Sequence, residues 1–240
     1  MRLVAKFLYG LYAAVLFTVL GLFSILIMTL LPDLERRRML ARGVSRTFLR
    51  LAGMSLTVVG LERLPDGPCI LVANHASYLD GLVFTAALPP RFGFVVKREM
   101  ATVPLAGFLL NRIGSQFMAR GQAHQTTRDA RRVMRTAVNG ESLVFFPEGT
   151  FSEEPGLLKF HLGAFAAAQR AGCPVVPAII HGSRAALPPG GTLPSPAALH
   201  IEILEPVRPS SSGSGAVPAL CRLARNAILG RLQEPDREAA

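Results

Sequence analysis

A histidine and an aspartate five residues apart follow an apolar run in the first third of the chain. The run Cys69–Ala73 leads directly into Asn74-His75-Ala76-Ser77-Tyr78-Leu79-Asp80. Open α/β sheets bind ligands where their strands end, which is where this histidine would lie. Asp80 could fold back and accept the Nδ1–H of His75, leaving Nε2 free to take a proton from a hydroxyl. A hydrogen-bonded turn without chemistry would use the same residues, so this spacing alone leaves both interpretations open.

A glutamate between a proline and a glycine follows a second apolar run. Ser142–Phe146 leads into Pro147-Glu148-Gly149-Thr150, a sequence poorly suited to continuing regular structure. Gly149 would allow a substrate to approach the backbone closely. Its amide, or a neighbouring one, could donate to an oxyanion. The alternative is a turn with an exposed glutamate.

Two further segments carry residues of interest. Gly114-Ser115-Gln116-Phe117-Met118-Ala119-Arg120 ends in an arginine, which could hold a phosphate through two hydrogen bonds. A solvated arginine at the end of a strand is the alternative. In Cys173-Pro174-Val175-Val176-Pro177, the prolines indicate a strand at a sheet edge or a rigid strand start.

Together these segments resemble the glycerolipid acyltransferase family that includes the 1-acylglycerol-3-phosphate acyltransferases. HASYLD, GSQFMAR, FPEGT and PVVP occur in the order and at the spacing of its four motifs. The resemblance extends from about Leu51 to Pro206. An NHxxxxD sequence followed about 70 residues later by FPEGT is highly specific for this family.

The resemblance implies a role for each motif. His75 would be the general base that deprotonates an acceptor hydroxyl, and Asp80 would orient it. The hydroxyl would attack the thioester of an acyl carrier protein or coenzyme A donor, without a covalent acyl-enzyme, a metal or a cofactor. The acceptor would be bound by Gly114, Phe117 and Arg120, and acceptor and tetrahedral intermediate by Glu148, Gly149 and Thr150. The fourth motif, with Pro177, is associated with acyl-chain packing.

One position departs from the family pattern. The third motif commonly continues with an arginine that helps to bind the acceptor phosphate, and this chain has Phe151 instead. Lys97, with Arg98 beside it, and Lys159 occupy places where the family often has basic residues. The leading acceptor is therefore still 1-acylglycerol-3-phosphate, which would give phosphatidate. Another lysolipid, such as a lyso-ornithine lipid or a glycolipid, is the alternative.

Alternating apolar runs and helix-like segments would position these residues. They predict an α/β fold, a mostly parallel central sheet flanked by helices, with an N-terminal membrane helix or helical hairpin. The expected strands are Ser55–Val59, Cys69–Ala73, Phe92–Val96, Ser142–Phe146, Val175–Ile180 and Leu199–Leu204. The expected helices are Tyr78–Ala87, Pro104–Asn111, Thr127–Val138, His161–Arg170 and Val217–Leu232.

The N-terminal run Phe7–Pro32 contains no charged residue and is long enough to cross a bilayer. It is longer than the core of a signal peptide, and no small-residue cleavage site precedes the arginines after it. Six arginines between Arg36 and Arg50 follow the run, against Arg2 and Lys6 before it. This asymmetry predicts the inner membrane with the main domain in the cytoplasm. A re-entrant hairpin bent near Gly21 is the alternative to one span.

Four regions follow from these observations. They are a membrane-inserted segment (1–32), an amphipathic interfacial helix (33–52), the acyltransferase domain (53–233) and a tail (234–240). The second region has apolar residues on one side and arginines between them, which suits a membrane interface or packing on the domain. In the last helix, Val217, Leu220, Leu223, Ala227 and Ile228 would face the core.

Composition narrows the partners. The net charge is +10, but there is no tryptophan or nucleic-acid motif, so an anionic membrane is a better partner than nucleic acid. Three separate cysteines without a CxxC indicate reduced thiols, and the remaining histidines lack metal-ligand spacing. A non-catalytic membrane-binding protein is the alternative of another class. The joint presence of His75, Asp80 and Glu148 counts against it.

Overall fold

A computed structural model describes residues 2–119, 123–209, 213 and 215–238, and its centre is a seven-stranded sheet. The strand order is β1-β7-β6-β2-β5-β3-β4. All neighbouring strands are parallel except β6 and β7, so the predicted mostly parallel α/β fold is confirmed. The strands are β1 Leu56–Val59, β2 Ile70–Ala73, β3 Phe92–Lys97, β4 Gln116–Met118, β5 Ser142–Phe145, β6 Val175–His181 and β7 Leu199–Ile203.

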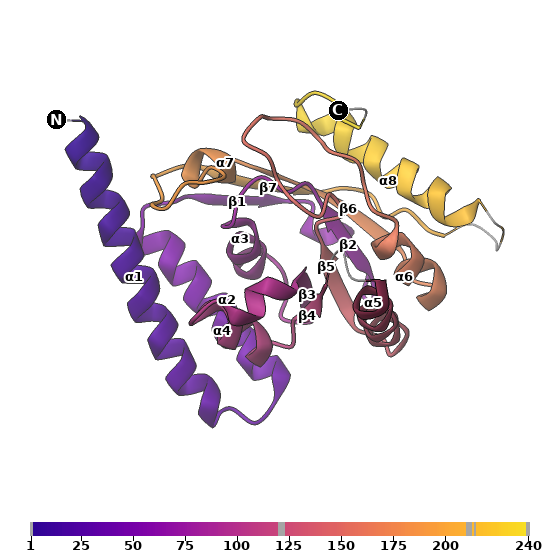
Figure 1. Cartoon of the computed structure of the whole chain (residues 1–240), viewed down its shortest axis with the longest axis horizontal. Coiled ribbons are helices and arrows are strands. Elements are labelled where there is room, and N and C mark those ends of the chain that lie inside the picture. The colour runs from indigo at the N-terminus through magenta and orange to yellow at the C-terminus, as the bar shows by residue number, and fades with distance from the viewer. Residues whose placement is uncertain (1, 120–122, 210–212, 214, 239–240) are drawn as a thin grey trace.

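The sheet lies between two layers of helices (Figure 1). α1, α2, α3 and α4 lie on one side, and α5, α6 and α8 on the other. The helices are α1 Arg2–Leu30, α2 Leu34–Leu51, α3 Asp80–Ala87, α4 Ala106–Arg112, α5 Ala123–Val138, α6 Gly163–Ala171, α7 Ser183–Ala186 and α8 Ala216–Leu232. Two 3₁₀ turns, η1 Leu61–Arg63 and η2 Arg98–Thr102, complete the described elements.

The central strand β2 is apolar throughout because both of its faces are buried. Leu71 and Ala73 join the core on the α2–α3 side, whereas Ile70 and Val72 join the core beneath α6 and α8. Every residue of β2 is inaccessible to solvent. Strands covered on both faces have such continuous hydrophobic runs, and β2 therefore fixes the position at which the polar His75 turn begins.

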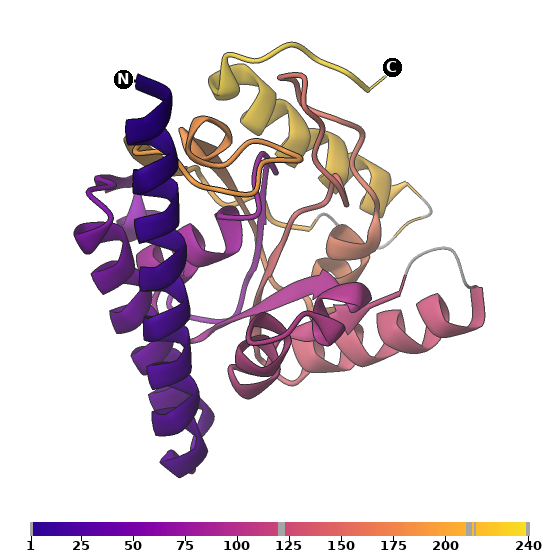
Figure 2. The ribbon, with the colours of Figure 1, turned by 60° about the vertical axis from the view of Figure 1, so that its left-hand side comes forward.

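The apolar N-terminal segment forms one continuous helix that packs along the domain (Figure 2). The alternative with a bend near Gly21 is wrong, because α1 remains helical through this residue. A side chain at Gly10 would clash with Leu193, and one at Gly21 would clash with Leu105. These close approaches explain the glycines. They also show that one face of α1 is committed to the domain.

Helix α2 packs on the domain through its arginines. Arg38 is 8% exposed and donates to the carbonyl oxygens of Ile113 and Arg91 and to Glu141, at 3.0, 3.1 and 3.1 Å. Arg46 donates to the carbonyl oxygen of Ala86 at 2.8 Å. Several arginines of the predicted basic cluster therefore hold α2 to the domain. An additional role of α2 at a membrane interface stays a prediction.

Three local expectations differ from the structure. β4 is an additional strand, since three residues are too short to show an alternating pattern. Pro174 directly precedes β6, as expected of a strand start, but Pro177 marks neither an edge nor a start, because β6 lies between β7 and β2 and Pro177 is its third residue. The antiparallel pairing with β7 begins only at Ala178, so the missing N–H of Pro177 is not needed there. Leu223 is 57% exposed and does not face the core.

Candidate active site

His75 and Asp80 form a hydrogen-bonded pair at the carboxyl end of β2. Asp80 Oδ2 lies 2.7 Å from His75 Nδ1 and accepts the backbone N–H groups of Ala76 and Ser77 at 2.7 and 3.0 Å. The Asp80 side chain is fully buried, whereas that of His75 is 19% exposed. A carboxylate held by two backbone amides keeps its position. It therefore fixes the imidazole with Nδ1 as the donor and Nε2 available for proton transfer.

Asn74 fixes the strand end from which His75 projects. Its side-chain amide donates to the carbonyl oxygen of Ile180 at 3.0 Å, and its side-chain oxygen accepts the N–H of Ile180 at 2.8 Å. These two hydrogen bonds tie the end of β2 to β6. The residue before the histidine is therefore an anchor for the backbone beneath it.

Glu148 connects the two motif segments through the backbone. Its Oε1 accepts the N–H of His75 at 2.6 Å, and its Oε2 accepts the N–H of Leu158 at 2.8 Å. The residue is 4% exposed. Burial raises the pKa of Glu148 to about 7, although the two amide donors work in the opposite direction. Because both oxygens already accept backbone donors, Glu148 is placed to position His75.

Aromatic rings surround the His75 imidazole. Phe146 stacks on it with ring centroids 4.3 Å apart, and Phe151 meets it edge-on at 4.5 Å. Phe151 also contacts Tyr78, at 4.8 Å between centroids. The residue that replaces the family arginine thus lies directly against the proposed base and makes this side of the site apolar.

Gly149 and Thr150 form the turn after Glu148. Gly149 has a φ of +75°, which favours glycine. Its N–H donates to the carbonyl oxygen of Phe146 at 3.0 Å, so this amide closes the turn and is not free to donate to an oxyanion. Thr150 is exposed beside Phe151. If this turn stabilises an oxyanion, the donor must therefore be a group other than the Gly149 N–H.

Two residues of the second motif, Gly114 and Phe117, lie at different places relative to the sheet edge that carries His75. Phe117 pairs with Val96 near the carboxyl end of β3. Gly114 precedes β4, and a side chain there would contact Leu34 and Arg38 of α2. Gly114 therefore packs against a helix, whereas Phe117 lies toward the edge that carries His75. Arg120 lies outside the described residues.

The basic residues that could bind a phosphate differ in whether a carboxylate already pairs with them. Both Arg98 Nη2 contacts go to the carboxylate of Asp129, at 2.6 and 2.7 Å, so Arg98 is held in a structural pair. Lys97 is exposed, with Glu99 3.8 Å away. Lys159 is exposed one residue after Leu158. Within the described part of the chain, no group of three or more metal-ligating side chains is arranged to hold an ion.

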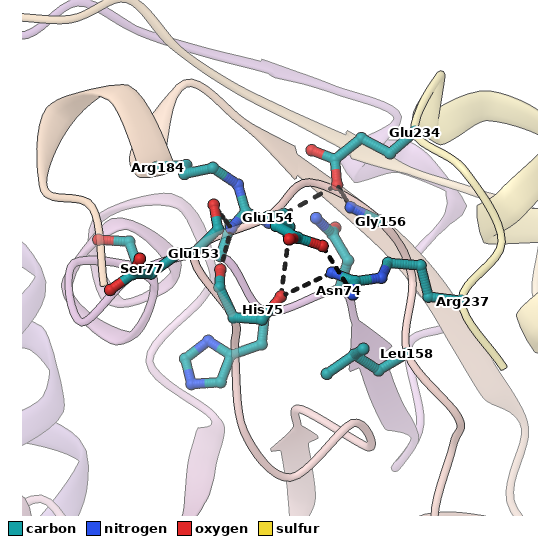
Figure 3. A network of polar contacts seen from close by, with 12 residues as sticks. Asn74, His75, Ser77, Glu153, Glu154, Gly156, Leu158, Arg184, Glu234 and Arg237 are labelled. Atoms are coloured by element: carbon teal, nitrogen blue, oxygen red, sulfur yellow. Dashed lines mark hydrogen bonds and ion pairs between the residues drawn. The ribbon is translucent and has the colours of Figure 1, made fainter. Parts of the chain in front are cut away.

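Sequence reasoning missed the residues that hold the loop after Glu148. Figure 3 shows Arg184, Glu234 and Arg237 gathered around this loop, beside Asn74 and His75. Arg184 donates to the carbonyl oxygens of Ser152 and Glu153. Arg184, Glu234 and Arg237 all lie outside the four motifs. No local sequence pattern could therefore have predicted that they hold this loop.

Comparisons with known proteins identify the family of the chain. The family model described as Acyltransferase matches residues 55–181, more than half of the chain. The chain is 35% identical over 55% of its length to a chloroplastic 1-acyl-sn-glycerol-3-phosphate acyltransferase of Brassica napus. It is 35% identical over 63% of its length to a lyso-ornithine lipid O-acyltransferase of Rhizobium meliloti. These matches span 39% and 51% of the two relatives.

A solved structure resembles nearly the whole chain. It is the crystal structure of the 1-acyl-sn-glycerophosphate acyltransferase PlsC from Thermotoga maritima, with a TM-score of 0.78 and 25% sequence identity. The match covers 96% of this chain and 97% of that one. Its extent includes the N-terminal helices as well as the sheet. On the family model, the relatives and the shared fold, the chain belongs to the acyltransferase family.

Proposed function

We propose that this chain transfers a fatty acyl group from a thioester donor to the hydroxyl of a lysolipid, with His75 as the general base. The observation that carries the proposal is the 2.7 Å contact between His75 Nδ1 and the buried carboxylate of Asp80. This geometry leaves Nε2 as the proton acceptor and provides a negative charge to stabilise the imidazolium that forms. Asp80 also accepts two backbone N–H groups of the turn, and the partly exposed imidazole that it holds favours a catalytic role over a purely structural one.

The proposed reaction proceeds without a covalent acyl-enzyme. His75 Nε2 takes the proton of the acceptor hydroxyl while its oxygen attacks the carbonyl carbon of the thioester. The tetrahedral intermediate then breaks its carbon–sulfur bond, and the departing sulfur receives the proton from His75. An ester and a free thiol result. Asp80 remains ionised throughout and keeps the imidazole in one orientation.

The acceptor that we propose is 1-acylglycerol-3-phosphate, which would give phosphatidate. Lys97, the last residue of β3, and Lys159, which follows Leu158, are both exposed. Their positive charges support an acceptor that carries a phosphate. A lyso-ornithine lipid is the second candidate. Phe151, which places an apolar ring where the family commonly has a phosphate-binding arginine, favours it. The similarity to a lyso-ornithine lipid O-acyltransferase supports the same candidate.

The test is an acyl-transfer assay of the purified full chain. A panel of lysophosphatidate, lyso-ornithine lipid and other lysophospholipids would be offered with acyl carrier protein or coenzyme A thioesters. We expect one acceptor to be acylated with release of one thiol per ester formed. Absence of transfer to every acceptor with both donors would contradict the proposal.

We infer that α1 attaches the chain to the cytoplasmic face of the inner membrane. Leu3–Leu30 has a mean hydropathy of 2.5 and is long enough to cross a membrane. Apart from Lys6, the exposed side chains along this helix are largely apolar, with Leu3, Phe7, Leu26 and Leu30 all more than half exposed. Because the other face packs on the domain, this helix would enter the bilayer with the domain held against the membrane.

The membrane attachment is tested by washing isolated membranes. Apolar insertion is not screened by ions, so we expect the chain to stay with membranes in about 1 M salt. Release under these conditions would indicate attachment by the arginine surface alone and would contradict insertion of α1.

A further inference from the structure

The chain turns back on itself after α8 and reaches the proposed active site. Gln233, the residue after α8, has a φ of +58°, an uncommon conformation for a residue other than glycine. The chain therefore leaves the helix axis abruptly. We call residues 233–238 the C-terminal strap and residues 151–158, which follow the FPEGT motif, the Phe151 loop.

The strap pairs with the Phe151 loop through the backbone. The N–H of Leu157 donates to the carbonyl oxygen of Pro235 at 2.9 Å, and the N–H of Arg237 donates to the carbonyl oxygen of Leu157 at 3.0 Å. At Gly156, a side chain would clash with the Arg237 side chain and approach the carbonyl oxygen of Pro235. The loop and the strap are thus held closely against each other.

Side chains of the strap fix the loop at two further points (Figure 3). Glu234 Oε2 accepts the N–H of Gly156 at 2.6 Å and lies 3.6 Å from the guanidinium of Arg184. Arg237 forms an ion pair with Glu154 at 2.8 Å. Arg184 in turn binds carbonyl oxygens of the loop. The loop is therefore held between α7 and the strap.

A buried arginine anchors the strap itself. Arg225 of α8 is 5% exposed and donates to both carboxylate oxygens of Asp236 and to the carbonyl oxygen of Leu157. The hydrogen bond from Arg225 lowers the pKa of Asp236 to about 2. Charge-assisted bidentate pairs of this kind have well-defined geometry. The strap is thus attached to the helix layer as well as to the loop.

The loop connects the strap to the proposed catalytic histidine in two ways. The N–H of Leu158 donates to Glu148, whose other oxygen accepts the N–H of His75. At the other end of the loop, the Phe151 ring contacts the His75 ring. Movement of the loop would therefore displace the groups that border the imidazole.

We propose that the C-terminal strap shapes the acceptor site through the Phe151 loop, and that Glu234 is a positioning residue which sets the shape of this loop beside His75. The proposal rests on the proposed function. It assigns a role in acceptor binding to a segment outside the four motifs, which acts through the loop and not on the reacting atoms. A strap that merely closes the fold would affect stability and leave acceptor affinity unchanged.

The test compares three variants of the full chain. Glu234→Ala removes the acceptor for the Gly156 N–H, whereas Glu234→Gln keeps an oxygen there. Glu205→Ala is the matched control, because the Glu205 side chain is 81% exposed and pairs with Arg63, which lies outside the loop and the strap. Displacing a positioned group can cost on the order of 100-fold. We expect Glu234→Ala to raise the acceptor KM about 10-fold or more and to leave the donor KM within about 2-fold.

Glu234→Gln should recover most of the acceptor affinity, and Glu205→Ala should match wild type. Hydrogen exchange gives a readout that does not depend on activity. The amides of Gly156, Leu157 and Leu158 should exchange faster in Glu234→Ala, while amides of β2 keep their protection. An acceptor KM equal to that of the control, or unchanged exchange in the loop, would overturn the proposal. If wild type transfers no acyl group at all, the proposed function fails, and exchange still decides whether Glu234 holds the loop.

Discussion

The two sides of the His75 imidazole are held by opposite means. On one side, Asp80 fixes the ring and the turn through bonds within six consecutive residues. On the other side, the Phe151 loop depends on Arg184, Glu234 and Arg237, which lie far away in the sequence. The proposed catalytic pair is therefore held by local contacts, whereas the Phe151 loop beside it is held by residues far away in the sequence.

The largest effect on activity is expected at Asp80, on the side of the imidazole that local contacts hold. Asp80→Asn would replace the carboxylate with an amide that cannot stabilise an imidazolium and can reverse the tautomer of His75. In the catalytic triad of serine proteases, the equivalent exchange lowers kcat about 10⁴-fold. We expect a loss in kcat of about 10²- to 10⁴-fold here, measured by steady-state acyl transfer.

Asp66→Asn is the matched control for this exchange, since Asp66 is an exposed aspartate in the loop before β2. It should retain wild-type turnover. If Asp80→Asn and Asp66→Asn were equally active, Asp80 would be an ordinary turn residue. The local contacts of His75 would then not support catalysis.

Glu148 lies between the two sides, and its ionisation should make stability depend on pH. Burial raises its pKa from 4.5 to about 7 in the folded chain. Between these values the unfolded chain loses the proton and the folded chain keeps it, so the contribution of Glu148 to stability falls as pH rises. Relative to Glu148→Gln, wild type should lose roughly 3 kcal/mol of unfolding free energy between about pH 4.5 and about pH 7.

The measurement is denaturant unfolding of wild type and Glu148→Gln in detergent at the two ends of this range. The variant cannot ionise at this position, so subtracting its curve removes the contribution of other titrating groups. A difference in unfolding free energy that stays constant with pH would mean that folding does not raise the pKa of Glu148.

A smaller and more selective effect is expected on the loop side. Phe151→Arg would put a guanidinium where a ring now contacts His75. A charge-assisted hydrogen bond to phosphate is worth roughly 1.5–3 kcal/mol, or about 10- to 150-fold in affinity. We expect a lower KM for lysophosphatidate and no gain for acceptors without a phosphate monoester.

Phe151→Leu is the control, because it removes the ring without adding charge. It should not improve the KM for lysophosphatidate. If Phe151→Arg brings no gain and wild type already prefers lysophosphatidate strongly, other cations supply the charge. Phe151 would then not determine the acceptor, and the loop would matter less to specificity than the comparison implies.

The sequence was sufficient for the parts of the molecule that depend on short-range patterns. The apolar run before Asn74 predicted β2, and the five-residue spacing predicted the contact between His75 and Asp80, which the structure confirms. Hydropathy likewise predicted the long N-terminal helix. Each of these features depends on residues within one element or one turn.

Features that depend on distant partners could not be predicted in this way. Glu148 has the sequence context of an exposed turn residue, yet it is buried because His75 and Leu158 supply its donors. The helix that carries Arg38 suited either a membrane interface or packing on the domain, and only the carbonyl oxygens that bind Arg38 show the packing. The tail, which was expected to be a separate region, pairs instead with Leu157.

Acyl transfer by His75→Ala tests the central claim most directly. The assay would use the acceptor and donor that serve wild type best, with His161→Ala as the control, because His161 is exposed. Since His75 is the proposed base, we predict a fall in kcat of about 10²- to 10⁴-fold with unchanged folding and membrane binding. His161→Ala should keep wild-type turnover. Turnover by His75→Ala close to that of wild type would contradict the account.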